Sequence, residues 1–558
     1  MSLPRIVAGK RRALMVRLLA NGVAQAAAAF AIAYLARGAL SAGQGAGEAR
    51  ALRVAGLVIA GLFLLALRAL ERVDAEHLGQ DYVTKVRLRL FERIAALPLR
   101  RESAGRFGLT MTRMVSDLNS LRRWVSVGVA RMSVASVSVC GILVALAYFD
   151  RVAAAVAGGL LLLSAAVAFG LTPALREQVR EARHRRGRLA GNVGEKIFAF
   201  GTVRHHGGTQ RELRRLRRQS RSMTRALVRR MRFSGLLRAL PDALFPLAIA
   251  ALVFLVGVEG AALSTGDLVV TLLLLGMFVP PVRDLAQAWD YRLSFLEGRR
   301  RIEQIFSIPR LRESPGAVAL PGAGPVGVAF RDVRVEGVLE AVTAAAEPGD
   351  RVLVTGATGS GKSTLLALAA RLFDPDAGEV AFDGFALRRI KLGCIETSVR
   401  LVSPELPLLR GSVAENIAYG VGADASACVE RVAGWCGLDA ACAALPRGLD
   451  TRVEEKGKNL PAGLRARVAL ARALAAEPRL LLIDDPLFGV DPEALAALRG
   501  ALRHTDATCL IAGSDGAALP GIDRIWRLGG GRLHEEVCGS ALGKRGAASA
   551  LPPAEASP

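Results

Sequence analysis

The cysteines of this sequence lack every pattern that is typical of a metal or redox site. Seven are present, at positions 140, 394, 428, 436, 442, 509 and 538, without a Cys-x-x-Cys pair and without the Cys/His spacing of a zinc site. We therefore expect ordinary reduced thiols in a cytosolic or membrane setting.

Acidic residues are scarce relative to basic ones, with 50 Asp and Glu against 74 Lys and Arg and a formal net charge of +24. Residues 176–232 alone hold 18 basic residues against four Glu. Nucleic-acid-binding segments share this excess, but this one lacks interleaved aromatic residues and lies between apolar runs. We expect an extended, solvated helix pair and no nucleic-acid partner. The alternative is that some of these arginines line an inward-facing cavity for an anionic or amphiphilic substrate.

Hydrophobic residues make up 52% of the chain, and the mean hydropathy of +0.33 is too high for an ordinary soluble protein. The apolar excess is confined to the first half, in runs of about 17–25 residues, which is long enough to cross a bilayer. We predict six membrane spans, near residues 14–35, 54–70, 128–149, 152–171, 239–258 and 268–288.

The connections between these spans alternate in charge. Three are short and hold almost no basic residues, whereas 71–127 and 172–238 are long and rich in arginine. Because basic residues stay on the cytoplasmic side, we expect a multi-pass integral protein of a bacterial-type cytoplasmic (inner) membrane, with both termini cytoplasmic. The first apolar run follows Lys10-Arg11-Arg12, and we expect it to be a retained membrane helix rather than a signal peptide.

Two short apolar patches interrupt the long basic segments. Residues 191–201 include Ile197 and Phe200, and residues 104–108 include Phe107. We expect each patch to form an exposed turn at the far tip of a helical hairpin, where it docks onto a soluble domain.

Proline and glycine are dense between 309 and 325, which marks a domain boundary. The predicted domains are a transmembrane domain over 1–308, a linker over 309–325, a nucleotide-binding domain over 326–538 and a disordered tail over 539–558.

One stretch of the second half fits G-x-x-x-x-G-K-[ST], the loop that holds nucleotide phosphates. It follows an apolar strand at Arg351–Thr355 and begins a helix, an order that directs backbone N–H groups at an anion. Lys362 is expected to reach the β- and γ-phosphates of ATP or GTP, and the Ser363 hydroxyl to hold Mg²⁺. The predicted nucleotide-binding residues are Gly356, Ala357, Thr358, Gly359, Ser360, Gly361, Lys362, Ser363 and Thr364.

A second apolar strand, Arg479–Asp484, ends in a carboxylate. We expect this strand to lie beside the strand of the phosphate-binding loop, so that Asp484 holds Mg²⁺ through water. The two motifs together are specific for P-loop NTPases.

With these motifs, the chain resembles an ABC transporter half-molecule of the exporter type over nearly all of residues 10–540. Supporting runs are Glu195 with Thr202–Arg204, Arg299–Phe306, Ala377–Val380 with Asp383-Gly384, Glu415–Ile417 and Ala469–Leu474. The resemblance implies an all-α six-helix transmembrane domain followed by an α/β P-loop ATPase domain. It also implies a dimer of two halves, in which each ATP lies between the phosphate-binding loop of one half and the signature loop of the other.

Several positions that carry the chemistry in this family are altered here. The aromatic residue that stacks on adenine falls near Gly337, and the glutamine that serves Mg²⁺ falls at Pro404, which has neither a side-chain amide nor an N–H. The switch histidine falls at Gly513. The glutamate that activates water is replaced by Asp485, a weak candidate for the general base because its reach is shorter by roughly 1.5 Å, enough to slow the reaction about 10²-fold.

The signature, Leu-Ser-Gly-Gly-Gln in the family, reads Leu460-Pro461-Ala462-Gly463-Leu464. Pro461 removes a backbone donor, and Ala462 adds a Cβ where the backbone approaches phosphate. Leu460 and Gly463 remain as candidates for holding the ATP of a partner.

These departures predict a chain that binds ATP and Mg²⁺ with weakened or lost hydrolysis. We expect the impaired half of a heterodimeric exporter, in membrane lipid and with a second ABC half as partner. The alternatives are a homodimer with weak ATPase activity and a nucleotide-sensing membrane protein that does not hydrolyse ATP. The expected substrate is a lipid, a peptide or a hydrophobic small molecule.

Overall fold

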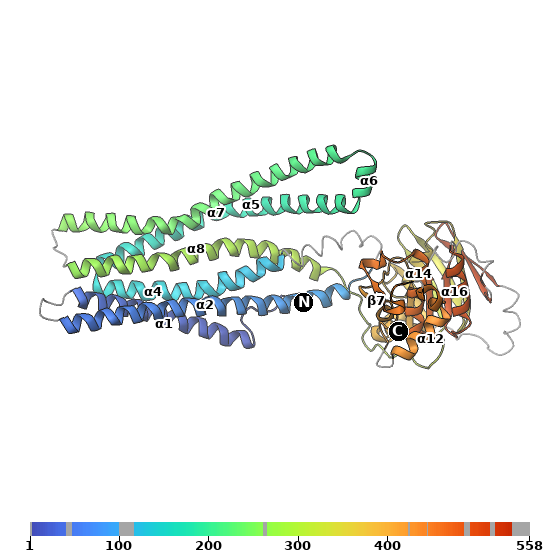
Figure 1. Ribbon diagram of the computed structural model, residues 1–558. Helices are drawn as coiled ribbons and strands as arrows, with labels where there is room; N and C mark the ends of the chain where they lie inside the picture. Colours follow the sequence, from blue (N-terminus) through green and yellow to red (C-terminus); the bar gives the residue numbers. More distant parts are fainter. Residues whose placement is uncertain are drawn as a thin grey trace, which may run out of the picture. The chain divides into compact units, whose positions relative to one another are not determined.

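The computed structural model divides the chain into two units, which meet in sequence between Pro309 and Arg310 (Figure 1). The structure describes residues 3–40, 47–99, 117–259, 265–421, 425–443, 445–484, 491–513, 519 and 521–537.

The first unit is entirely helical in its described part. Six of its helices are long and apolar enough to cross a membrane, which confirms the predicted six-helix transmembrane domain. The helices are α1 (Lys10–Leu40), α2 (Gly47–Ala95), the π-helical turn η2 (Trp124–Ala130) continued by α4 (Arg131–Phe149), α5 (Arg151–Phe198), α6 (Phe200–His205), α7 (Thr209–Glu259) and α8 (Thr265–Ser307).

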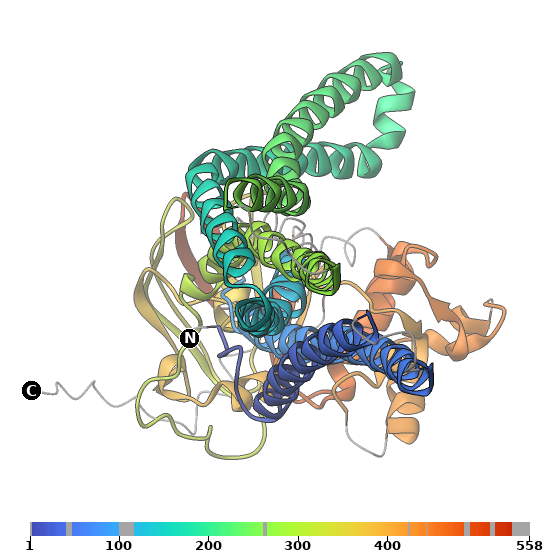
Figure 2. The same ribbon diagram turned by 90° about the vertical axis from the view of Figure 1, so that its left-hand side faces the viewer.

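The helices continue far beyond the predicted spans, because the arginine-rich segments prolong the membrane helices. Helices α5 and α7 form an antiparallel hairpin that α6 closes at its tip (Figure 1). Seen from the end in Figure 2, this green hairpin stands apart from the blue helices α1 and α2. Helix α5 runs to Phe198, so the turn begins at Ala199, later than the glycine at 191 suggested. Ile197 and Phe200 are exposed at this tip, as expected. The tip predicted at 104–108 lies outside the described residues.

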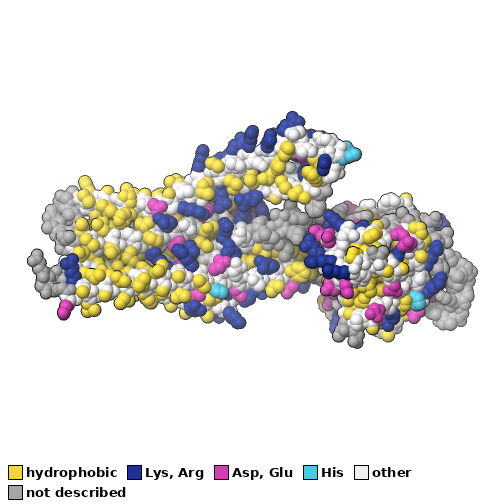
Figure 3. All heavy atoms as spheres, in the orientation of Figure 1, with side chains coloured by type: hydrophobic (Ala, Val, Ile, Leu, Met, Phe, Trp, Pro, Cys, Tyr) yellow, Lys and Arg dark blue, Asp and Glu magenta, His cyan; other side chains and the backbone are white. Residues whose placement is uncertain are grey.

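The outer surface of the bundle is apolar at one end and rich in arginine at the other (Figure 3). One buried carboxylate links α7 to α8. Asp290 of α8 is fully buried, and Arg230, Ser234 and Arg238, at successive turns of α7, all bond to it. A buried charge is tolerated when it is paired and hydrogen-bonded in this way.

The second unit contains two main sheets, one antiparallel and one mostly parallel. The four-stranded sheet has the order β2-β1-β4-β5, and the six-stranded sheet has the order β12-β11-β3-β10-β9-β6. The strands are β1 (Val328–Val335), β2 (Leu339–Ala346), β3 (Arg351–Gly356), β4 (Ala377–Phe382), β5 (Phe385–Ala386), β6 (Val399–Val402), β9 (Leu480–Asp484), β10 (Thr508–Ala512), β11 (Arg524–Gly529) and β12 (Arg532–Val537), with the small pair β7 (Gly411–Ser412) and β8 (Arg452–Val453) separate.

This order corrects one expectation. Strand β10 lies between β3 and β9, so the strand that ends in Asp484 is not the neighbour of the phosphate-loop strand. The apolar sequences of β3, β9 and β10 are equally suited to central positions of a parallel sheet, and the sequence pattern alone does not rank them.

Helices cover this unit in two groups with separate hydrophobic clusters. Helix α9 (Lys362–Ala369) packs with β1, β2 and β4. Helix α14 (Ala462–Ala475) packs with α12 (Ala425–Trp435) and α16 (Pro492–Leu502). The remaining helices are the short α10 (Leu392–Ser398), α11 (Val413–Ile417) and α13 (Leu438–Ala443).

Candidate functional site

The phosphate-binding loop joins β3 to α9 in a conformation that requires glycine. Gly356 and Gly361 have φ angles of +147° and +106°. A Cβ at Gly356 would lie 2.2 Å from the Leu528 carbonyl oxygen, and one at Gly361 would lie 2.7 Å from Leu339 Cδ2. Glycine alone fits both positions, so the backbone can curl around an anion.

The loop is closed by its own lysine. Lys362 Nζ donates to the carbonyl oxygens of Gly356, at 2.7 Å, and Ala357, at 3.0 Å. The Ser360 hydroxyl is buried without a hydrogen-bond partner among the described residues. An unpartnered buried hydroxyl inside a loop of this kind is consistent with a ligand that brings acceptor atoms.

The two predicted magnesium ligands lie together. Ser363 Oγ, in the first turn of α9, donates to Asp484 Oδ1 at 2.9 Å. The parallel register aligns Val354 of β3 with Ala512 of β10, and Ala512 with Asp484 of β9. Asp484 therefore reaches the carboxyl edge of the sheet where the loop begins, although β10 lies between the two strands. A carboxylate and a hydroxyl are the hard oxygen ligands that Mg²⁺ prefers.

The remaining signature residues, Leu460 and Gly463, lie at the start of α14. Leu460 is buried in the α14 cluster. Gly463 is buried against Asp491, and a Cβ there would lie 1.6 Å from Asp491 Oδ2. Pro461 is the N-cap of α14 and offers no side-chain hydrogen bond, whereas a serine there would cap the helix.

The altered positions have structural consequences of their own. Gly337 has a φ of +71° in the turn between β1 and β2, where the Val338 N–H donates to the Val335 carbonyl oxygen. This is a turn position that glycine favours. The Gly513 N–H donates to the Val354 carbonyl oxygen, 3.1 Å away. Asp485 lies outside the described residues.

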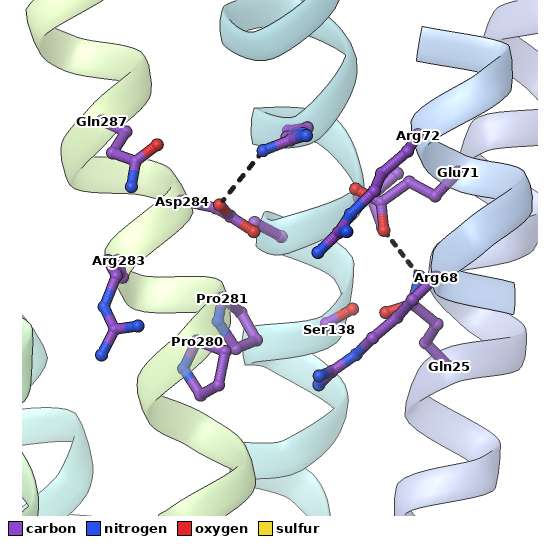
Figure 4. A pocket seen from close by; sticks show the side chains of 13 residues that line it. Gln25, Arg68, Glu71, Arg72, Ser138, Pro280, Pro281, Arg283, Asp284 and Gln287 are labelled. Carbon is purple, nitrogen blue, oxygen red and sulfur yellow. Dashed lines mark hydrogen bonds and ion pairs between the residues drawn. The ribbon is translucent and has the colours of Figure 1, made fainter. Parts of the chain in front are cut away.

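The transmembrane unit contains a polar cavity of about 270 Å³. Its polar lining comes from α1, α2, α4 and α8 and consists of Gln25, Arg68, Glu71, Arg72, Arg131, Ser138, Arg283, Asp284 and Gln287 (Figure 4). A space of this volume holds a headgroup rather than a whole lipid.

The two carboxylates of this cavity already have partners. Gln25 Nε2 donates to Glu71 Oε2 at 2.8 Å, and Arg131 lies 3.9 Å from Asp284 Oδ1. Arg283 points away from the other charged groups in Figure 4 and binds Asp242 of α7.

Two arginines of the cavity, Arg68 and Arg72, are close enough to Asp284 to interact with it electrostatically but do not contact it directly. Within the part of the chain that the structure describes, neither Arg68 nor Arg72 has a hydrogen-bond or ion-pair partner. They lie one turn apart on α2, and both side chains extend into the cavity (Figure 4). Like charges at this spacing repel each other, which an anion between them relieves.

A second cavity, of about 190 Å³, is lined by Arg183 and Arg186 of α5 and Arg230 of α7. All three belong to the basic segment 176–232. The alternative that some of these arginines line a cavity therefore agrees with their placement.

Two family models match the chain in succession. The model described as "ABC transporter transmembrane region" matches residues 13–282, and the model described as "ABC transporter" matches residues 339–488. The chain is an ABC half-transporter. It is an ATP-binding, multi-pass membrane protein in which a six-helix transmembrane domain precedes an α/β ATPase domain.

The half-transporter is similar to bacterial proteins of known name. It is 26% identical over 498 residues to the ATP-dependent lipid A-core flippase of Thiobacillus denitrificans, covering 86% of this chain and 85% of that protein. It is 27% identical over 530 residues to the flippase of the same name from Chromobacterium violaceum, covering 88% and 86%. Its fold is that of an ABC exporter, since a bacterial Atm1-family ABC exporter with ATP bound superimposes with a TM-score of 0.85 at 22% identity, covering 96% of this chain and 97% of the other.

One polar residue that the sequence analysis did not single out lies beside the predicted magnesium ligands. Ser403 Oγ lies 3.5 Å from Asp484 Oδ2, on the side opposite Ser363. The signal was its place directly after the short strand Val399–Val402, one residue before Pro404. Interpreting that signal requires knowing that β6 pairs with β9, and the sequence does not predict this pairing.

Proposed function

We propose that this half-transporter is the catalytically impaired, ATP-binding subunit of a heterodimeric membrane exporter. The observation that carries the proposal is the Ser363–Asp484 pair beside a fully formed phosphate-binding loop. Around this pair, Pro404 and Gly513 offer no side chain that could hold Mg²⁺ or the γ-phosphate. This chain therefore keeps the residues that bind ATP but lacks residues that its hydrolysis requires.

In a heterodimer the impairment is shared between two sites. This chain's loop pairs with the partner's signature, while the partner's loop pairs with the signature that begins at Leu460. Because Pro461 lacks both a hydroxyl and an N–H, the second site loses donors to phosphate. In a homodimer, both sites would have the altered catalytic positions and the altered signature, and only weak ATPase activity would remain. A nucleotide-sensing protein without turnover is the remaining alternative.

We further propose that the transported substrate carries an acidic group. Arg68 and Arg72 form no hydrogen bond or ion pair with the described residues and extend into the cavity of Figure 4. Guanidinium groups bind phosphate and carboxylate through paired hydrogen bonds. On the same stripe of α2, Val58, Leu62 and Leu65 are exposed, which offers an apolar surface for a tail. An acidic lipid matches both parts better than a peptide or a small apolar molecule.

The names of the relatives point the same way, since both are called lipid A-core flippases. We propose that the protein resides in a bacterial inner membrane with both termini cytoplasmic, in accord with its arginine-rich hairpin.

The experiment that tests the function is co-purification from the native membrane. Any partner is identified, and Mg-ATP turnover is measured for the chain alone and for the complex. We expect slow or no turnover alone and restored turnover in the complex. Turnover by the single chain at rates normal for the family, lost in Lys362→Ala, would contradict the impaired site. Absence of nucleotide binding would overturn the proposal as a whole.

A further inference from the structure

The hydroxyl of Ser403 lies beside the carboxylate predicted to serve magnesium. Ser403 Oγ is 3.5 Å from Asp484 Oδ2, while Ser363 Oγ donates to Oδ1 at 2.9 Å. Two hydroxyl groups from separate elements thus flank a single carboxylate.

The position of Ser403 follows from the strand order. Strand β6 is the parallel neighbour of β9, and their register pairs Val402 with Ile483. The next residues along each strand, Ser403 and Asp484, therefore emerge together at the carboxyl edge of the sheet. Ligands bind at this edge in open α/β sheets.

Ser403 is held in place by the loop that follows it. The Leu406 N–H donates to the Ser403 carbonyl oxygen at 3.0 Å, which closes a turn with Pro404 at its second position, where proline is favoured. Arg472 of α14 donates to the Leu406 carbonyl oxygen at 3.0 Å. Ser403 is 8% exposed, so packing restricts its side chain.

We propose that Ser403 replaces the glutamine side chain that is lost at Pro404, as an oxygen donor to the Mg²⁺ of bound ATP or to its bound water. This rests on the proposed ATP binding by the loop that contains Lys362. Mg²⁺ takes oxygen ligands and usually keeps several waters, so a short hydroxyl side chain next to a carboxylate is a suitable donor. The proposed oxygen donor, Ser403, thus lies one residue before the position of the family's glutamine, and the turn that contains Pro404 orients it.

A purely structural role for this hydroxyl makes a different prediction. The Glu405 N–H donates to Ser403 Oγ at 3.3 Å, so the serine also supports the turn. Loss of that support would affect the stability of the fold and ATP binding with or without metal. Loss of a magnesium ligand would affect only the metal-dependent part.

The test uses the purified full-length protein in lipid nanodiscs. ATP affinity is measured with Mg²⁺ and with EDTA for the wild type and for Ser403→Ala. We expect the ratio of the two affinities to fall roughly tenfold in Ser403→Ala, the scale on which supporting ligands act on metal sites, with the EDTA value unchanged. Ser403→Thr, which keeps the hydroxyl, retains the ratio. Adding Pro404→Gln to Ser403→Ala restores it.

Mn²⁺ in place of Mg²⁺ supplies a spectroscopic readout. The electron paramagnetic resonance spectrum of Mn²⁺ in the ATP complex is expected to change in Ser403→Ala and not in Ser403→Thr. An unchanged affinity ratio in Ser403→Ala, or an equal loss with Mg²⁺ and with EDTA, overturns the inference while ATP binding stands. A wild-type chain that binds no ATP under either condition overturns the inference and the proposed function together.

Discussion

Ser363 and Asp484 share a hydrogen bond of 2.9 Å although 121 positions separate them in the chain. The strands that lead to the two residues are not neighbours, because β10 lies between β3 and β9. The bond therefore bridges an intervening strand and gathers two oxygen ligands at one edge of the sheet. The magnesium binding expected of this protein would depend on that tertiary contact.

The first prediction concerns Lys362. Its ammonium group lies at the loop carbonyl oxygens, from where it can turn to phosphate. We expect Lys362→Ala to weaken ATP binding about 10-fold to 100-fold, since charged hydrogen bonds contribute about 1.5–3 kcal/mol each. Isothermal titration calorimetry measures the affinity. Lys391→Ala, at an exposed lysine of the same domain, is the control, and equal affinities of the two variants would contradict the assignment.

The second prediction concerns the signature helix. A Cβ at Gly463 collides with Asp491, which caps α16 by accepting from the N–H groups of Glu493 and Ala494. We expect Gly463→Ala to destabilise the soluble domain by about 1–2 kcal/mol through loss of this cap. Chemical denaturation measures the change. Ala462→Gly at the adjacent exposed position is the control, and a Gly463→Ala chain as stable as this control would show that Asp491 adjusts freely.

The third prediction concerns the charged cavity. We expect Arg68→Ala with Arg72→Ala to bind phosphatidic acid at least about tenfold more weakly, since two charged hydrogen-bond donors are lost. Binding of phosphatidylcholine is expected to stay the same. Native mass spectrometry of nanodiscs with defined lipid mixtures measures both. Arg50→Ala, on the same helix outside the cavity, is the matched control, and an equal loss in that variant would indicate a nonspecific charge effect.

A fourth prediction compares two carboxylates that link α7 and α8. Asp290 is fully buried between Arg230 and Arg238, whereas Asp242 and its partner Arg283 are both substantially exposed. We expect Asp290→Asn to lower stability by about 1.5–3 kcal/mol, because it removes the charge that accepts hydrogen bonds from two partly buried arginines. Asp242→Asn is expected to change it by less than about 1 kcal/mol. Thermal unfolding in detergent distinguishes them, and similar melting temperatures would refute the difference.

The fifth prediction concerns thiol reactivity. Burial raises the pKa of the Cys436 and Cys509 thiols to about 12. The thiolate is the reactive form, so at pH 8 we expect both to react with maleimide about a thousandfold more slowly than in the unfolded chain. Cys394, which is partly exposed, is the internal reference. Mass spectrometry of labelled peptides reads the rates, and comparable labelling of all three in the folded protein would contradict the buried positions.

Local patterns in the sequence were sufficient for the fold class, the six spans and the nucleotide-binding loop. Apolar runs of bilayer length, charge asymmetry and the spacing of Gly356, Gly361 and Lys362 act over short distances along the chain, so no knowledge of packing was needed. The position of Asp484 at a strand end was readable for the same reason.

The relationships between distant segments were decided by the tertiary structure alone. The sequence analysis predicted β9 next to β3, but β10 lies between them. Central parallel strands share one apolar pattern, so the sequence does not distinguish their order. Ser403 lies beside Asp484 because β6 pairs with β9, and the sequence does not predict this pairing. Among the described residues, Arg68 and Arg72 form no hydrogen bond or ion pair because Gln25 binds Glu71 and Asp284 faces Arg131. No local pattern encodes these contacts between helices.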